Sequence, residues 1–138
     1  MSNPSAMKAL LLAATLLVST VLSAQEVVQR SFHSNGEVSE VRFPSGDRIL
    51  FVRYHDNGKV YERGAFSNGK PDGVWKRYDT QGDLVAKVRF ENGLREGRCL
   101  YTSLDGQARY HLSYEDGRLV RGEQYDASGE MVAEKENR

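Results

Sequence analysis

Histidines and aspartates are the residues whose types and spacing in this sequence could do chemistry. His33 and His55 each follow an aromatic residue in the stretches FHSNG and YHDNG, and two imidazoles at matching positions could hold a transition metal. Later stretches of the same form have other polar residues there, namely Asp79, Thr102 and Asp126. Because this position accepts any polar residue typical of turns, we favour turn formation over a metal site and expect no cofactor.

Four aspartates are the candidates for acid–base catalysis: Asp56, Asp72, Asp79 and Asp126. Each lies in a turn-like stretch beside glycine, where an aspartate side chain usually bonds the backbone. Motifs of hydrolases, metalloproteases and nucleotide-binding loops (GxSxG, HExxH, the P-loop) do not occur. The single cysteine, Cys99, has no second cysteine for a disulfide or a CxxC site. We expect it to be a small structural residue of a strand. The sequence therefore predicts a protein that is not an enzyme.

Composition restricts the partners. The chain has 138 residues, enough for one domain, and its 19 basic and 19 acidic side chains cancel. A neutral chain presents no strong field to DNA, RNA or an anionic bilayer. We therefore expect no nucleic-acid partner and disfavour a membrane-surface role. Arg and Lys side chains alternate with Glu in the segments between turns, and we expect them to pair across strands on a wet face.

The N-terminus, residues 1–24, has the pattern of a secretory signal peptide. Lys8 precedes an apolar run from Ala9 to Leu22, and small residues follow it. This run is shorter than the about 20 residues that a membrane span needs. We therefore expect export, to the periplasm or out of the cell, with cleavage near Ala24.

The sequence after this segment repeats with a period of about 23 residues. Each copy contains two turn-forming glycines, and an aromatic residue stands three to five positions before each glycine. The predicted turn glycines are Gly36, Gly46, Gly58, Gly69, Gly82, Gly93, Gly106, Gly117 and Gly129. We predict one repeat domain over residues 25–138, with copies at about 32–53, 54–77, 78–100 and 101–124 and a partial copy at 125–138.

The segments between the turns have the length and the period-two alternation of strands. In residues 84–91 and 108–115, every second side chain is apolar. We expect Leu50, Val52 and Tyr54 to continue the same apolar face. The predicted fold class is all-β: an antiparallel β-meander of repeated hairpins, forming a single-layer twisted sheet of about 9–10 strands in which bulges absorb small differences in copy length.

The stretch YHDNGKVYERGAFSNGKPDGVWKRYDTQGDLVAKVRFENGLREG, residues 54–97, resembles the bacterial variant of MORN repeats. In that family Tyr-x-x-Asn-Gly-Lys is followed by Tyr or Phe, Asn-Gly-Lys, Asp-Gly and Trp, and GKPDGVW at 69–75 is the most specific match. The resemblance extends over about residues 32–130 and weakens in the first and last copies.

Cys99 and Gln124 are the nearest equivalents of Trp75 in the later copies. The resemblance implies a curved sheet of hairpins that is not catalytic and serves as a scaffold or binding surface. Some bacterial members are antitoxin-like.

Aromatic residues that recur in the copies are the candidate binding surface. In a single-layer sheet their rings would stack on one face and stay partly wet, and exposed aromatic stripes mark partner surfaces. We expect binding to an unknown protein, or to a second copy of the chain, through this face or a sheet edge. A cell-envelope glycan-binding module and an antitoxin-like neutralising protein are the alternatives, and the export signal disfavours the second. The candidate residues are Trp75, Tyr78, Phe90, Tyr101, Tyr54, Phe66 and Tyr114.

Overall fold

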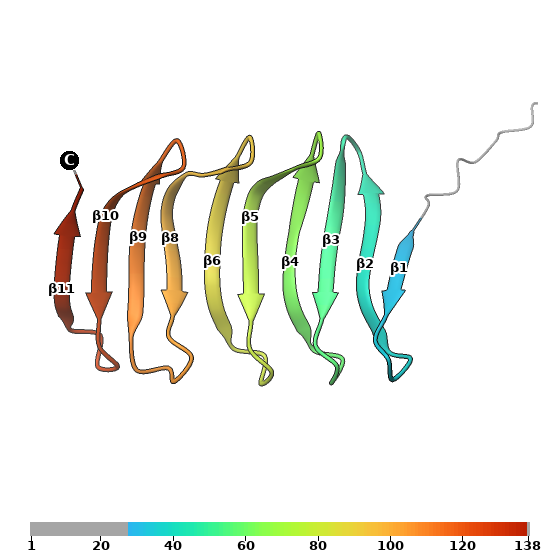
Figure 1. The fold of residues 1–138 in the computed structure, drawn as a ribbon, viewed down its shortest axis with the longest axis horizontal. Helices are drawn as coiled ribbons and strands as arrows, with labels where there is room; N and C mark the ends of the chain where they lie inside the picture. Colours follow the sequence, from blue (N-terminus) through green and yellow to red (C-terminus); the bar gives the residue numbers. More distant parts are fainter. Residues whose placement is uncertain (1–27, 138) are drawn as a thin grey trace, which may run out of the picture.

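The computed structural model describes residues 28–137, which form one open antiparallel sheet without a helix (Figure 1). The predicted signal peptide, residues 1–24, lies outside the described residues. In the part of the chain that is described, no helix has the length and apolarity of a membrane crossing. The strands are β1 (Gln29–Phe32), β2 (Val38–Ser45), β3 (Arg48–Tyr54), β4 (Val60–Ser67), β5 (Lys70–Tyr78), β6 (Leu84–Glu91), β7 (Leu94–Arg95), β8 (Gly97–Thr102), β9 (Arg109–Glu115), β10 (Arg118–Tyr125) and β11 (Met131–Glu136).

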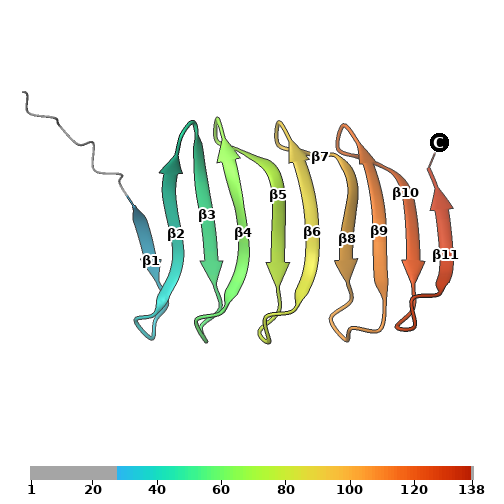
Figure 2. The same cartoon turned by 180° about the vertical axis from the view of Figure 1, so that it is seen from behind.

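The strands follow one another in the sheet in the order in which they follow in the chain. The path runs β1-β2-β3-β4-β5-β6-β8-β9-β10-β11, and the two-residue strand β7 pairs with β6 beside this path. Short turns join all neighbours, so every pair is antiparallel. The sheet is elongated and curved, and β1 and β11 are its two open edges (Figures 1 and 2). The predicted all-β meander of hairpins is confirmed.

The turns form because glycine tolerates a positive φ. All nine predicted turn glycines have φ between +63° and +97°, so these turn assignments are confirmed. Three hairpins at one end of the sheet have positive φ at two successive residues, as two-residue type I′ turns require. These pairs are Asn68 and Gly69, Asn92 and Gly93, and Asp116 and Gly117.

The five turns at the other end share a second geometry. In the loop that starts at Asp79, the Gly82 amide donates to the Asp79 carbonyl at 3.1 Å, and the Asp79 amide donates to the Asp83 carbonyl at 2.9 Å. In the fourth such loop Ser103 makes these bonds, so our assignment of Thr102 to this position is wrong. The YTSLDG loop contains one residue more, and the chain therefore enters the turn one residue later.

The two faces of the sheet have different side chains, because directly paired residues lie on the same face. The first face, which we call the aromatic face, contains Phe51, Phe66, Trp75 and Phe90. Leu50 pairs with Phe43 and Ala65 and therefore lies on the opposite face, together with Val52 and Tyr54. Our expectation that these three residues continue the aromatic face is wrong. Residues 49–52 are all apolar, so alternation within them cannot select a face.

Little of the molecule is buried, as expected for one layer. Among residues 28–137 the buried hydrophobic side chains are Phe51, Ala65 and Cys99, which are 3%, 4% and 0% exposed. Cys99 pairs with Leu112, and Leu112 pairs with Gly122 across β8, β9 and β10. The sheet is therefore held together mainly by its backbone ladder and by contacts between neighbouring copies.

Equivalent positions along the copies explain which residues are buried. The position three residues before the end of a strand is equivalent in β3, β5, β8 and β10. It is occupied by Phe51, Trp75, Cys99 and Gly122, in that order. Cys99 is thus the counterpart of Trp75, as the sequence predicts, whereas in the next copy the counterpart is Gly122 and not Gln124. From Trp75 onward the residue at this position becomes smaller, so the aromatic contacts concentrate in the first half of the sheet.

Candidate binding surface on the aromatic face

Four rings form a continuous aromatic cluster over β3, β4, β5 and β6. The ring centroid of Trp75 lies 5.3 Å from Phe51, 5.0 Å from Phe66 and 6.2 Å from Phe90. The pairs with Phe66 and Phe90 are edge-to-face, the arrangement that the ring quadrupoles prefer. The indole Nε1 donates a hydrogen bond of 3.1 Å to the Ala65 carbonyl. Trp75 is therefore the centre of the cluster and is fixed in position by contacts on several sides.

Gly64 makes room for the indole ring. A Cβ atom added to Gly64 would lie 2.2 Å from Trp75 Cδ2 and 2.3 Å from Cε2, far inside van der Waals contact. The register of β4 and β5 shifts here, between Arg63 and Ala65. The role of Gly64 was not predicted, although a glycine inside a strand pattern is a recognised sign of close approach.

Charged side chains of alternating sign cross the same face. Glu40 accepts from Arg42 at 2.7 Å and from Arg53 at 3.2 Å, while Glu62 pairs with Arg77 at 3.0 Å and lies 3.9 Å from Arg53. The five residues come from β2, β3, β4 and β5, so the network crosses four strands. Charges therefore pair across strands as expected, but this network lies on the aromatic face and not on the separate wet face that the sequence predicts.

Two of these arginines also cover the aromatic cluster. The guanidinium carbons of Arg42 and Arg53 lie 5.4 and 5.2 Å from the ring centroid of Phe51, and that of Arg42 lies 5.7 Å from Phe66. These distances are within the range of cation–π attraction. The aromatic face therefore presents rings and charges side by side, as the surfaces of protein interfaces do.

A change at Glu40 tests this network through pH. Burial raises the pKa of Glu40, but hydrogen bonds from Arg42 and Arg53 outweigh burial and hold its pKa below the usual 4.5. A lowered folded-state pKa means that the stabilisation is complete above about pH 4.5 and disappears as the pH falls through the folded pKa. We expect Glu40→Gln to lower the free energy of unfolding at pH 7 by less than about 1 kcal/mol.

The measurement is thermal unfolding of wild type and Glu40→Gln between pH 7 and pH 3. The difference between their melting temperatures should shrink below pH 4.5, because the wild-type carboxylate becomes protonated. Glu37→Gln is the control, since Glu37 is exposed and lies in a turn. A difference that stays constant over this pH range would contradict the network.

Beside the aromatic cluster the face is hollowed. The hollow has a volume of about 230 Å³ and lies over β4, β5, β6, β7 and β8. Its lining combines apolar side chains with acidic and basic ones, so it can hold a side chain of a partner or a small polar ligand. The residues of the aromatic face that line it are Glu62, Pro71, Trp75, Arg77, Val88, Phe90, Arg95 and Tyr101; Lys76 also borders it, although its pairing with Arg63 and Lys87 places its side chain on the opposite face.

Five of the seven predicted binding residues lie on the aromatic face: Trp75, Phe66, Phe90, Tyr101 and Tyr114. Trp75, Phe90 and Tyr101 share the hollow. Tyr101 pairs directly with Tyr110, and Arg95 lies 5.5 Å from the ring centroid of Tyr114.

Tyr54 and Tyr78 lie on the opposite face, where Arg63 stands 5.7 Å from the ring of Tyr78. The expectation that Tyr54, Tyr78 and Tyr101 share one face is wrong. Tyr101 comes one residue before the end of β8, whereas Tyr54 and Tyr78 end their strands, so alternation points Tyr101 to the other side.

The paired histidines join neighbouring copies. His33 Nε2 donates to the Tyr54 carbonyl and His55 Nε2 donates to the Tyr78 carbonyl, each at 3.0 Å. Among the described residues no three His, Cys, Asp or Glu side chains gather as metal ligands would. The turn interpretation of His33 and His55 therefore agrees with the geometry, with the addition that each imidazole links one turn to the next.

Two candidate catalytic aspartates bond their own turns. Asp79 Oδ1 accepts from the amides of Gln81 and Asp83, each at 2.9 Å, and these backbone hydrogen bonds, that from Asp83 first, lower the pKa of Asp79. Asp126 accepts from Ser128 in the same way, and the Ser128 hydroxyl is the main cause of its lowered pKa. Both carboxylates therefore accept hydrogen bonds within their own turns.

The other two aspartates differ from the prediction. Asp72 lies within β5 rather than in a turn, and its carboxylate is 3.4 Å from Arg48 Nη2. In the loop of Asp56 the neighbouring Asn57 bonds the backbone instead, accepting from the Lys59 amide at 3.0 Å. The Asn57 amide oxygen thus accepts from the Lys59 amide, which corresponds to the Asp83 amide that the Asp79 carboxylate accepts from in its own loop.

Comparison with known proteins agrees with the repeat pattern. Residues 71–92 match the family model of the MORN repeat variant, so the predicted resemblance is confirmed there. No curated protein matches the sequence.

Two similar solved structures are those of TarM. The first has 15% sequence identity and a TM-score of 0.42 and covers 83% of this chain and 20% of TarM. The second, a mutant of TarM from S. aureus in complex with fondaparinux, alpha-GlcNAc-glycerol and UDP, has 15% identity and a TM-score of 0.41 and covers 80% of this chain and 19% of that one. The present chain thus spans about a fifth of the length of these proteins.

Proposed function

We propose that this protein is a non-catalytic binding module, a role that the match of residues 71–92 to the MORN repeat variant supports. Its partner is a protein, which docks on the aromatic face at the hollow beside Trp75. The N-terminal pattern further supports export of the module to the periplasm or out of the cell. Detection of the mature protein, shortened by about 24 residues, outside the cytoplasm would test the export.

The observation that carries this proposal is the aromatic cluster, in which Phe51 is buried but Phe66, Trp75 and Phe90 stay partly exposed. Phe51, Phe66, Trp75 and Phe90 lie on a sheet with no second layer among the described residues. Aromatic side chains that stay partly exposed as one group are typical of partner surfaces. The neighbouring ion network and the hollow add charge and shape, which give specificity rather than affinity alone.

Substitution at Tyr101 tests the docking surface with a matched control on the other face. Tyr101 lines the hollow, so Tyr101→Ala should weaken binding of the native partner by at least about 1 kcal/mol, a typical value for an interface aromatic residue. Tyr78→Ala removes the same ring from the opposite face and should leave the affinity unchanged.

The partner is first identified by co-purification of the tagged full-length protein and mass spectrometry, and then titrated with each purified variant. Light scattering of the purified protein distinguishes a second copy of the chain from another protein. Equal loss of affinity in Tyr101→Ala and Tyr78→Ala, or no loss in Tyr101→Ala, would refute docking at the hollow.

A glycan is the second candidate, favoured by the composition of the hollow. Trp75 and Tyr101 offer rings for stacking on sugar rings, and Glu62, Arg77 and Arg95 offer hydrogen-bonding groups. A soluble cell-wall oligosaccharide that binds there should change the fluorescence of Trp75, the single tryptophan of the chain. No fluorescence change and no co-sedimentation with peptidoglycan would exclude this candidate.

A further inference from the structure

The opposite face of the sheet carries three cations in direct cross-strand register. Arg63 of β4 pairs with Lys76 of β5, and Lys76 pairs with Lys87 of β6. Directly opposed like charges destabilise a sheet, so this arrangement is unfavourable for folding alone. Arg89 and Arg98 stand near Lys87 around one hollow. We call these five residues the cationic row.

Within the described sheet, most of the cationic row has no ion pair, unlike the arginines of the network on the aromatic face. Among the described residues, Arg63, Lys76, Lys87 and Arg89 form no ion pair with a carboxylate. Arg98 alone is paired, with Glu123 at 3.0 Å. On the aromatic face every arginine of the network has a glutamate beside it. Our prediction that the charges of the wet face pair across strands is therefore wrong in this part of the sheet.

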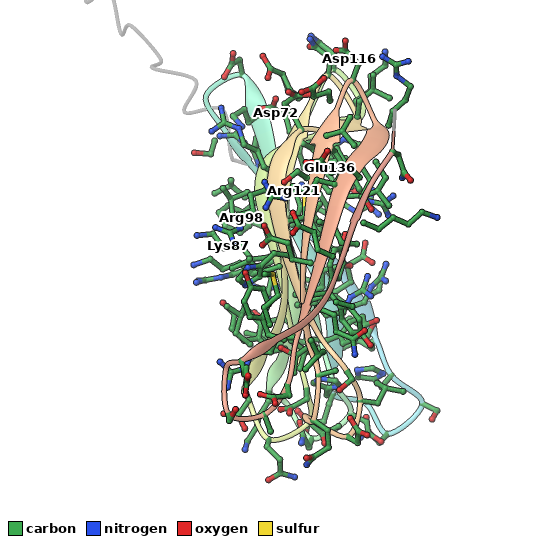
Figure 3. The ribbon with its side chains drawn as sticks, turned by 90° about the vertical axis from the view of Figure 1, so that its left-hand side faces the viewer. Asp72, Lys87, Arg98, Asp116, Arg121 and Glu136 are labelled. Atoms are coloured by element: carbon green, nitrogen blue, oxygen red, sulfur yellow. The ribbon has the colours of Figure 1, made fainter. Side chains whose placement is uncertain are left out.

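The row is open to solvent. Lys87, Arg89 and Arg98 are exposed and Lys76 is half-buried. Lys87 and Arg98 project from the same side of the sheet (Figure 3). The hollow that they share with Arg89 has a volume of about 430 Å³, and Glu91 and Glu96 are its acidic residues. Glu96 is already engaged, because its Oε2 accepts from the Asp116 amide at 2.9 Å.

We propose that the cationic row is a binding site for linear polyphosphate, a chain of phosphate units joined through single oxygens. Neighbouring strands are about 4.8 Å apart, so Arg63, Lys76 and Lys87 require anions at similarly close spacing. A polyphosphate carries a charge on every unit and meets this condition. An extended acidic peptide does not, because its side chains on one face repeat only every about 6.6 Å.

The rest of this face argues against two other polyanions. The cross-strand line through Lys87 continues over Leu100 and His111 to Glu123 and Glu134. A flat anionic bilayer on this face would be forced against those carboxylates, whereas a linear chain can follow the cations only. A single-stranded nucleic acid needs exposed rings for base stacking, and the ring nearest the row, Tyr78, already has Arg63 over it.

Neutral substitutions in the row test this proposal. The full-length purified protein is titrated with fluorescent inorganic polyphosphate, and affinity is measured at several salt concentrations. Lys76→Gln with Lys87→Gln should weaken binding at least about tenfold and make its salt dependence shallower, because two phosphate contacts are lost. The melting temperature of this variant should equal or exceed that of wild type, because the opposed charges no longer repel each other.

The matched control removes the same two charges elsewhere. Arg118 and Lys135 are exposed residues of β10 and β11, so Arg118→Gln with Lys135→Gln should bind polyphosphate within about twofold of wild type if the row is the site. Undetectable wild-type binding, or equal losses in both double variants, would overturn the proposal. It would also be overturned if poly-glutamate, single-stranded DNA or anionic vesicles bound as tightly as polyphosphate. Because this site is on the opposite face, its failure would leave docking on the aromatic face untouched.

Discussion

Replacing Trp75 by alanine should lower the free energy of unfolding by about 3 kcal/mol, the lower end of the range for large aromatic residues. The side chain touches Phe51, Phe66 and Phe90, and its Nε1 bonds the Ala65 carbonyl. In a sheet with few buried side chains, no other residue makes as many aromatic contacts within the described range. The loss should appear in urea unfolding followed by far-ultraviolet circular dichroism.

Trp75→Phe is the matched control. It keeps a ring over Gly64 but removes the indole N–H and part of the contact area. The expected loss is about 1 to 2 kcal/mol, which combines one hydrogen bond with reduced packing. If Trp75→Ala cost less than Trp75→Phe, or less than about 1 kcal/mol, the ring would not hold the copies together. The aromatic cluster would then be a surface feature only.

Introducing a methyl group at Gly64 should destabilise the protein by about 2 kcal/mol, within the range for overpacking. The new Cβ would clash with Trp75 Cδ2 at 2.2 Å, so the indole must leave its position. Its fluorescence should shift to longer wavelength as the ring becomes more exposed. Gly122→Ala is the control, because the nearest atom there is the flexible end of Leu112 at 3.3 Å.

A double-mutant cycle makes this second prediction specific. In the background of Trp75→Ala, Gly64→Ala should cost much less than in wild type, because the clashing ring is absent. Contacting residues typically show coupling energies of about 0.5 to 3 kcal/mol. Additive effects of the two substitutions would mean that Gly64 matters for backbone conformation and not for the ring.

Turn chemistry was predictable because it is local. Asn-Gly and Asp-Gly pairs favour positive φ in two-residue hairpin turns, and the pairs that end in Gly69, Gly93 and Gly117 adopt it at both residues here. The period of these pairs was enough to derive hairpins, their order and the single sheet. The residue that ends each loop was harder to predict, since one additional residue before Gly106 moved Tyr101 to the other face.

Site residues were less predictable because they depend on register. Phe51 is the most buried aromatic residue of the cluster. It was not predicted as a site residue, because it lies among four successive apolar residues whose alternation selects no face. Gly64 was missed because its role depends on Trp75, eleven residues later in the chain. The direct pairing of Lys76 with Lys87 could not be predicted either, because it depends on the register of β5 and β6. The composition alone predicts that lysine pairs with glutamate.

The sequence by itself determined the class of fold, the repeat, the places of the turns and the family of the segment at 71–92. Each of these depends on a few neighbouring residues and on the backbone conformations that those residues prefer. Only the tertiary structure decided which side chains share a face, because bulges change the alternation from copy to copy and a shift of one residue reverses it. Docking surfaces are made of such faces. The aromatic face and the cationic row therefore became visible only when the strands were placed side by side.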